Sequence, residues 1–288
     1  MYFTKYVYMS KMYFIKYIFL QTVVAWRFSV FQAALHQSLV WTEFLRLALG
    51  INAQNVIFVV HTAHQATMNP CIEQSTLQFL SDLRQNNQRD WFQAHRDDYR
   101  QAADNFAQVL QALIDGLAKI DPALQGLSSA RCTYRIYNDM RFHSKPPYKT
   151  HLAAYITPNG KNTGAAGFYL HIEPGASMFI GGIYKPPTRV MQSIREDISF
   201  YCADFEKIIA PLKHLHFLEA DSLKQPPRGV EAHPSVVEYL KMRSICPTQT
   251  FADAEVVAHD FVAQCLHLAA KLHPLNQFIN RAVAMAQD

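Results

Sequence analysis

Basic residues crowd one short stretch of the chain. Between positions 131 and 149 stand residues that could act together chemically, namely Arg131, Arg135, Asp139, Arg141, His143, Lys145, Tyr148 and Lys149. One carboxylate cannot neutralise five arginines and lysines, so the remaining charge must meet water, an acid from elsewhere in the fold, or an anionic ligand. An arginine guanidinium matches a phosphate or carboxylate group with two parallel hydrogen bonds. The stretch therefore predicts an anion-binding site.

The predicted site contains residues that bind and residues that could react. We expect a phosphate or carboxylate group to be held by Arg135, Arg141, Lys145 and Lys149, with Glu173 also at the ligand-binding site. Acid–base chemistry could come from Asp139, Tyr148 and His143. The aspartate would orient an arginine or act as a base, and the tyrosine or the histidine would donate a proton. These roles describe an enzyme, but the residues alone leave open whether the protein is one.

A structural interpretation competes with the anion site. Arginine–carboxylate networks also occur inside proteins that bind no small molecule. The same residues could therefore form an internal ion-pair network in a non-enzymatic structural or protein-interaction domain. The position of the side chains distinguishes the two, because arginines in a pocket favour a ligand and arginines saturated by acids favour a structural role. The partner predicted by the first interpretation is an unidentified anionic small molecule.

Other kinds of chemistry have weaker support. His171 and Glu173 would share one face of a strand, and such ligands suit zinc or iron. His143 could approach them, but the sequence offers no convincing third ligand, so we predict no metal and no other cofactor. No Gly-x-Ser-x-Gly elbow and no phosphate-binding loop is present. The pair Gly181-Gly182 instead indicates a close approach of two backbones or a bulge.

Residues 68–288 predict a single α+β domain that would position these side chains. Apolar residues recur at helical spacing in segments near 75–85, 88–120, 186–201, 235–243, 254–271 and 274–285. Alternation with a period of two predicts strands near 132–137, 151–157, 165–173 and 177–183. Turn residues separate the last three strands, which indicates an antiparallel meander. We expect N-terminal and C-terminal helices to flank this sheet.

The order of residues in the basic stretch resembles a known family. The runs that carry the resemblance are Arg135-Ile-Tyr-Asn-Asp-Met-Arg-Phe142 and Lys145-Pro-Pro-Tyr-Lys-Thr150, with Asn86-Asn87, Asp90-Trp91-Phe92, Tyr169–Gly175, Gly181-Gly182, Pro227–Gly229 and His233-Pro234 in support. They are similar to the bacterial conserved hypothetical family called domain of unknown function 2461, over about residues 75–285. Asn138 stands where that family usually has a second arginine, and Ser144 where an acid or amide is usual. The resemblance implies a bacterial protein without an established activity.

The first 67 residues differ from the rest in composition. They contain 14 of the 36 aromatic residues, none of the 14 prolines, and five basic residues against one acid. The remaining 22 basic and 22 acidic residues cancel, so all of the net charge of +4 lies before Met68. The neutral balance of residues 68–288 counts against binding of nucleic acid.

Three interpretations of this leader compete. It could be upstream DNA translated from a mistaken start, a membrane-associated segment, or a signal peptide. Its longest uncharged apolar runs, Tyr17–Trp26 and Phe28–Trp41, are separated by Arg27 and fall short of a membrane span. We expect a cytoplasmic protein, with membrane association only if the leader is expressed.

Overall fold

A computed structural model describes residues 70–286, apart from 140–145, 162, 219–221 and 231–232. The chain divides into two units, Met1–Met68 and Asn69–Asp288, and the description below concerns the second. The competing interpretations of residues 1–67 therefore lie outside the described residues. Among the helices of the described part, none combines the length and the hydrophobicity that crossing a membrane requires.

A five-stranded antiparallel sheet lies at the centre of the domain. Its strands are β1 (Leu152–Ile156), β2 (Gly167–Ile172), β3 (Ser177–Gly182), β4 (His216–Phe217) and β5 (Pro247–Phe251). They lie in the order β1-β2-β3-β5-β4, and every neighbouring pair is antiparallel. Strands β1 to β3 form the predicted meander. The α+β fold class is thus confirmed.

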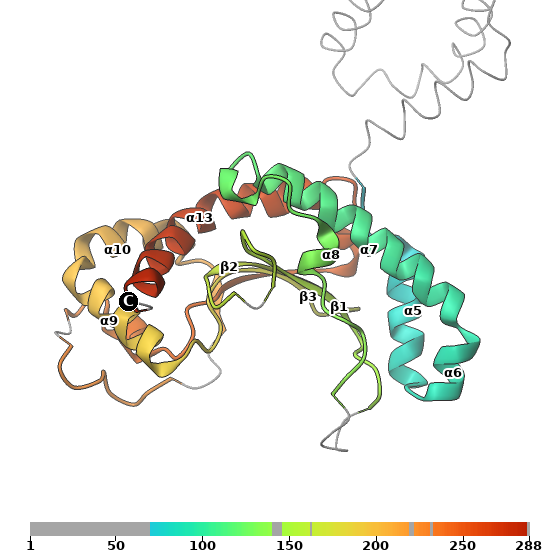
Figure 1. Cartoon of the computed structure of the whole chain (residues 1–288), viewed down its shortest axis with the longest axis horizontal. Helices are drawn as coiled ribbons and strands as arrows, with labels where there is room; N and C mark the ends of the chain where they lie inside the picture. The colour runs from blue at the N-terminus through green and yellow to red at the C-terminus, as the bar shows by residue number, and fades with distance from the viewer. Residues whose placement is uncertain (1–69, 140–145, 162, 219–221, 231–232, 287–288) are drawn as a thin grey trace, which may run out of the picture. The chain divides into compact units, whose positions relative to one another are not determined.

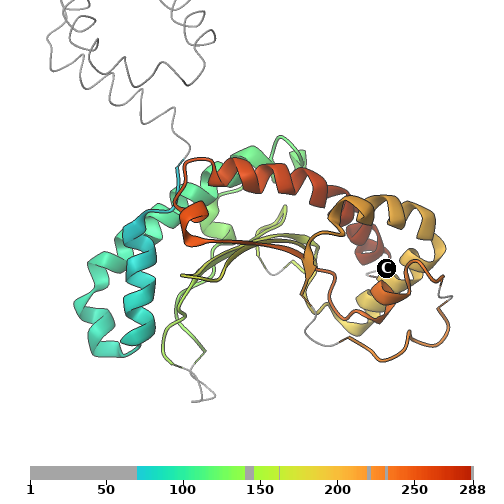
Figure 2. The same ribbon diagram turned by 180° about the vertical axis from the view of Figure 1, so that it is seen from behind.

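Helices cover one face of this sheet and both of its ends. They are α5 (Gln74–Gln85), α6 (Arg89–Ala94), α7 (Arg96–Leu117), α8 (Ser129–Cys132), α9 (Thr188–Phe200), α10 (Cys202–Ile209), α11 (Val237–Lys241), α12 (Asp253–Val256) and α13 (Phe261–Met285). The long helices α7 and α13 lie on the same side of the sheet in both views (Figures 1 and 2). We call this side the covered face and the opposite side the open face.

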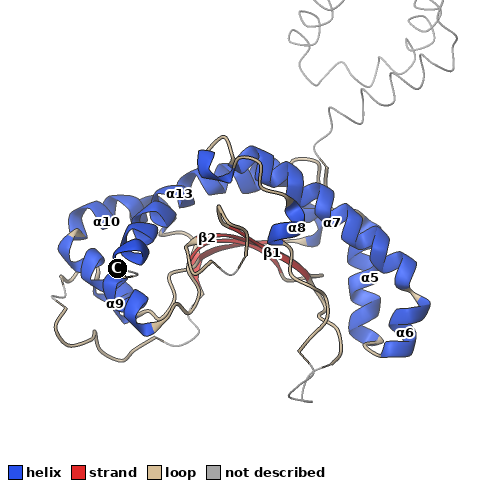
Figure 3. Cartoon of the chain, viewed as in Figure 1, coloured by secondary structure: helices blue, strands red, loops and turns tan. Residues whose placement is uncertain are grey.

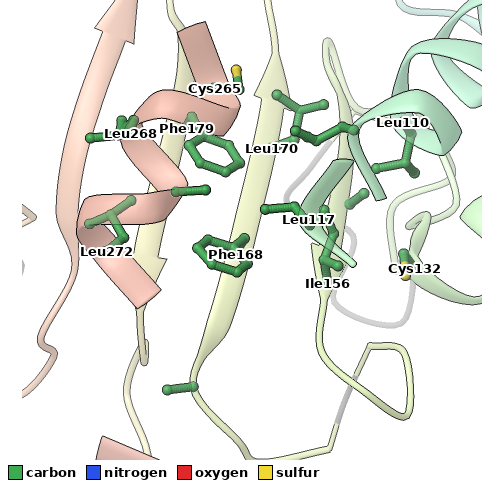
Figure 4. Close-up of a cluster of buried hydrophobic side chains, with 14 of the residues drawn as sticks. Leu110, Leu117, Cys132, Ile156, Phe168, Leu170, Phe179, Cys265, Leu268 and Leu272 are labelled. Carbon is green, nitrogen blue, oxygen red and sulfur yellow. The ribbon is translucent and has the colours of Figure 1, made fainter. Parts of the chain in front are cut away.

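The alternation of side chains along the strands separates these two faces. Phe168 and Leu170 of β2 and Phe179 of β3 point to the covered face, where they are at most 2% exposed. They pack against leucines of α7 and α13, which Figure 4 shows as one cluster with Leu110, Leu117, Leu268 and Leu272. The residues between them in sequence, such as Tyr169, point to the open face. The core therefore lies on one side of the sheet and leaves the other side available for a site.

Several helix boundaries differ from the sequence-based prediction. The predicted cap Ser75 lies inside α5, and its hydroxyl donates to the carboxylate of Glu73. Asn87 precedes α6 without capping it, because its side chain binds another segment. The predicted break at Pro274 is also wrong, since α13 continues through this proline. Leucines packed on both sides of it in the core, Leu272 and Leu275, compensate the local loss of a hydrogen bond.

The predicted strand at 132–137 is wrong as well. Cys132 ends the short helix α8, and only isolated bridges follow, from Thr133 to Ala154 and from Tyr137 to Tyr148. Asn138 N–H donates to the carbonyl of Pro147, which closes the segment into an irregular hairpin arm. The segment is extended, which explains the alternation with a period of two. Its bridging partner changes along its length from Ala154 to Tyr148, so no regular strand forms. Strands β4 and β5 were not predicted, since neither shows a clean alternation.

Candidate functional site

A pocket of about 660 Å³ lies over the open face of the sheet. Its walls are contributed by β1, β2 and β3, by the start of the hairpin arm, and by the segment after β3. The residues that line it are mostly apolar or aromatic and include Tyr134, Ala153, Tyr155, Tyr169, Met178, Ile180, Ile183, Tyr184, Pro186, Leu218 and Cys246. Two lysines, Lys149 and Lys185, also line it. Pockets of this size and character commonly hold small molecules.

The hairpin arm is fixed to the helical end of the domain by Asn87. The side-chain amide of Asn87 donates to the Tyr148 carbonyl at 2.9 Å, and its oxygen accepts from the Tyr148 N–H at 3.1 Å. The Tyr148 ring stacks on Phe92 of α6, with centroids 3.9 Å apart and planes 11° from parallel. These contacts hold the backbone next to Lys149. The asparagine and aromatic segment singled out in the sequence therefore positions the basic motif.

Among the described residues of the basic motif, Lys149 lines the pocket. Its ammonium donates to the Arg135 carbonyl at 2.8 Å and lies 5.7 Å from the centre of the Tyr134 ring. Burial and the nearby Arg135 guanidinium lower the pKa of Lys149 below its usual value. This acceptor is a neutral carbonyl, so an anion brought to the Lys149 ammonium would gain a strong interaction.

The other predicted motif residues are placed differently. Arg135 is exposed and forms no ion pair with another residue that the structure describes. Asp139 is also exposed and does interact with the protein. Tyr148 is buried, which raises its pKa, and its stacking favours a structural role over proton donation. Arg141, His143 and Lys145 lie outside the described residues.

Glu173 belongs to a second cluster at the end of β2. Its Oε2 lies 2.9 Å from His171 Nε2, and its Oε1 accepts from the Thr150 hydroxyl at 2.9 Å and from Arg84 at 3.3 Å. The Tyr169 hydroxyl is hydrogen-bonded to His171 Nδ1 at 3.0 Å. The ring of His151 stacks on the His171 ring, with centroids 4.3 Å apart. Two histidines and a carboxylate thus meet at the wall of the pocket.

Burial controls the protonation of this cluster. Desolvation, with a smaller contribution from His171, lowers the pKa of His151 to about 4. Burial by itself would raise the pKa of Glu173, but hydrogen bonds from His171 and Thr150 together with the nearby imidazoles lower it below its usual value. Burial also raises the pKa of Tyr169 to about 12. At neutral pH the cluster therefore presents a neutral His151, a carboxylate and a protonated tyrosine.

The cluster contains residues that the sequence analysis missed. His151 was not singled out, because it is 20 residues or more from its partners in sequence. Leu152 pairs with Ile172 in the ladder, so His151 and Glu173 lie next to the same end of the pair β1–β2. A prediction of which residues of β1 and β2 pair would have shown that His151 lies near Glu173.

The glycine pair at the end of β3 brings two backbones together, as predicted. Gly182 has φ of +103°, and a Cβ at this position would collide with the carbonyl of Ile245. Three residues later, Lys185 has φ of +43°, which non-glycine residues rarely adopt, and its N–H donates to the Ser244 hydroxyl at 2.9 Å. Backbone with a positive φ angle is frequent at functional sites, and Gly182 and Lys185 both line the pocket.

Comparison with known proteins identifies the family to which this domain belongs. No curated protein and no solved structure matches the chain. A family model described as conserved hypothetical protein, domain of unknown function 2461, matches residues 75–278, which include the sheet, the basic motif and the pocket. Since the match covers well over half of the 288 residues, the chain is a member of the family of conserved hypothetical proteins with domain of unknown function 2461.

Proposed function

We propose that this domain binds a small molecule that carries a carboxylate or phosphate group on an apolar body. The observation that carries the proposal is the pocket of about 660 Å³ on the open face, whose mostly apolar lining includes Lys149. Apolar walls with few well-placed polar groups are typical of sites for small ligands. The aromatic rings would cover the body of the molecule, and the lysine would bind its charged group.

The electrostatics of Lys149 favours an anion over a neutral ligand. Its pKa is lowered by desolvation and by the neighbouring Arg135, which means that the ammonium is less stable here than in water. A bound carboxylate or phosphate would remove this penalty and form a charge-assisted hydrogen bond. Of the two predicted cations that the structure describes, Arg135 and Lys149, it is Lys149 that lines the pocket.

The alternative, an internal ion-pair network, receives less support from the described residues. Arg135 is exposed, and no described acid forms an ion pair with it. Lys149 donates to a backbone carbonyl and not to an acid. Glu173 contacts Arg84 and His171, which lie outside the basic motif. The proposal concerns binding, and catalysis is not part of it.

The proposal is tested by thermal shift and calorimetry on the full chain with benzoate, octanoate and phenyl phosphate. A ligand of the folded state raises the melting temperature. We expect at least one of these probes to do so, and Lys149→Met to weaken its binding about 10-fold or more, because a hydrogen bond between charged groups is lost. Ile180→Trp should also weaken binding by filling the pocket.

The matched control is Lys213→Met, which removes the same charge from an exposed lysine away from the pocket. This variant should bind as the parent does. Equal affinity of Lys149→Met and the parent would show that Lys149 does not hold the ligand. Unchanged binding by Ile180→Trp would place the ligand elsewhere on the protein.

A further inference from the structure

The cluster of His151, His171 and Glu173 has the composition of a metal site. The nitrogen and oxygen atoms that these three residues could offer as ligands all lie within 4.8 Å of one another. Two histidines with one glutamate are the ligands of many zinc enzymes, and two histidines with one carboxylate also bind iron(II) in oxygenases. The sequence by itself predicted no metal because a third ligand was missing, and His151 supplies that third ligand.

The distance between the ligand atoms of His171 and Glu173 already suits a bound metal ion, whereas His151 would have to move. Two donors about 2.1 Å from one ion and at a right angle to each other lie about 3 Å apart. His171 Nε2 and Glu173 Oε2 are 2.9 Å apart, which matches this arrangement. His151 is half-buried and stacks on His171, so binding of an ion would require its ring to turn toward the other two donors.

The groups around the three residues also suit metal ligands. A ligating histidine usually binds an oxygen through its second ring nitrogen, and His171 does so through Nδ1 and the Tyr169 hydroxyl. The outer oxygen of Glu173 is fixed by Thr150 and Arg84, which leaves Oε2 directed at His171. A ligating carboxylate is held in the same way. Arg84 reduces the charge of Glu173, but its side chain is 47% exposed, so water screens this effect.

We propose that His151, His171 and Glu173 bind one divalent transition-metal ion, with its remaining coordination positions facing the pocket. The direction follows from the lining of the pocket, which includes both histidines and Tyr169. When the ion binds, it would replace the hydrogen bond between His171 Nε2 and Glu173 Oε2. The imidazole proton would then be on Nδ1, which would donate it in a hydrogen bond to the Tyr169 hydroxyl. Two neutral histidines and one carboxylate leave a divalent ion with a net charge of about +1. Such a centre would attract an anion, but the metal-site proposal does not depend on the anionic ligand of the proposed function.

The test uses the untagged full chain after treatment with a chelator. We expect equilibrium dialysis to show uptake of one equivalent of zinc(II) or cobalt(II), with visible d–d absorption for the cobalt form. His151→Ala and Glu173→Gln should each weaken the affinity for cobalt(II) about 100-fold or more, because each removes a ligand. Tyr169→Phe should weaken it 10- to 100-fold, since it removes a group that orients a ligand.

The control is His267→Ala, which removes an exposed histidine of α13 and should leave cobalt(II) binding unchanged. No uptake of either ion at micromolar concentration, or equal affinity of the parent and Glu173→Gln, would overturn the proposal. The glutamine keeps the shape of Glu173, so this variant decides the question if His151→Ala does not fold. Lys149→Met should lose binding of the anionic probes but keep the cobalt(II) spectrum, which separates failure of the metal site from failure of the anion site.

Discussion

Gly182→Ala is expected to lower the free energy of unfolding by about 3 kcal/mol or more. Two effects add at this position. The φ angle of +103° lies in a region that an alanine adopts only with strain, and the new Cβ would collide with the carbonyl of Ile245. That carbonyl cannot move away easily, because it accepts a hydrogen bond from the Ile183 N–H. This bond joins the end of β3 to the segment that precedes β5. Denaturant unfolding of the variant and the parent measures the difference.

Gly175→Ala is the matched control for this prediction. Gly175 also has a positive φ, of +74°, but nothing lies within 4 Å of the position that its Cβ would take. Only the backbone strain should therefore lower the free energy of unfolding of this variant, by about 1 to 2 kcal/mol. If the two substitutions destabilise the protein equally, the close approach of the backbones at Gly182 does not exist as described.

Asn276→Leu is expected to lower the free energy of unfolding by about 3 kcal/mol. Asn276 is 4% exposed on α13, and its oxygen accepts from the Gly182 N–H at 2.7 Å. Its amide donates to the Gly167 carbonyl at 3.2 Å, and Gly167 pairs with Gly182 in the sheet. Leucine has a similar size but would leave both buried backbone groups without a partner. The measurement is again denaturant unfolding, with circular dichroism to confirm that the variant folds.

Asn280→Leu provides the comparison one helical turn later. Asn280 holds the N–H and the carbonyl of Ala166 in the same manner, at 2.7 and 3.1 Å, but it is only part-buried. Water can replace a lost partner there, so we expect a smaller loss, about 1 kcal/mol. A larger loss at Asn280 than at Asn276 would show that burial does not determine the strength of these contacts.

The parts of the fold with strong periodicity could be predicted from the sequence. The meander of β1 to β3 follows from alternation with a turn signal at Glu173-Pro174-Gly175, and α7 follows from its apolar stripe. The continuous helix through Pro274 could not be predicted, because the packing that outweighs the proline comes from residues distant in sequence. For the same reason the short strands β4 and β5 were missed, since β5 pairs with the edge of β3 and β4 pairs with β5.

The candidate site was predicted in part. The basic motif led to Lys149, which does line a pocket, and the pair His171 and Glu173 was recognised as sharing one face of a strand. The pocket itself could not be predicted, because it depends on which face of the sheet the helices leave open. His151 joins the cluster only through the pairing of β1 with β2, which brings together residues 20 or more positions apart in sequence.

If the pocket on the open face binds the anionic ligand, methyl NMR should locate the ligand there. The full chain, labelled at isoleucine and methionine methyl groups, would be titrated with phenyl phosphate. We predict that the signals of Met178 and Ile180, which line the pocket, move with increasing ligand, while that of Ile114 in the core on the covered face stays in place. Movement confined to methyl groups outside the pocket, with Met178 and Ile180 unchanged at saturation, would contradict the account.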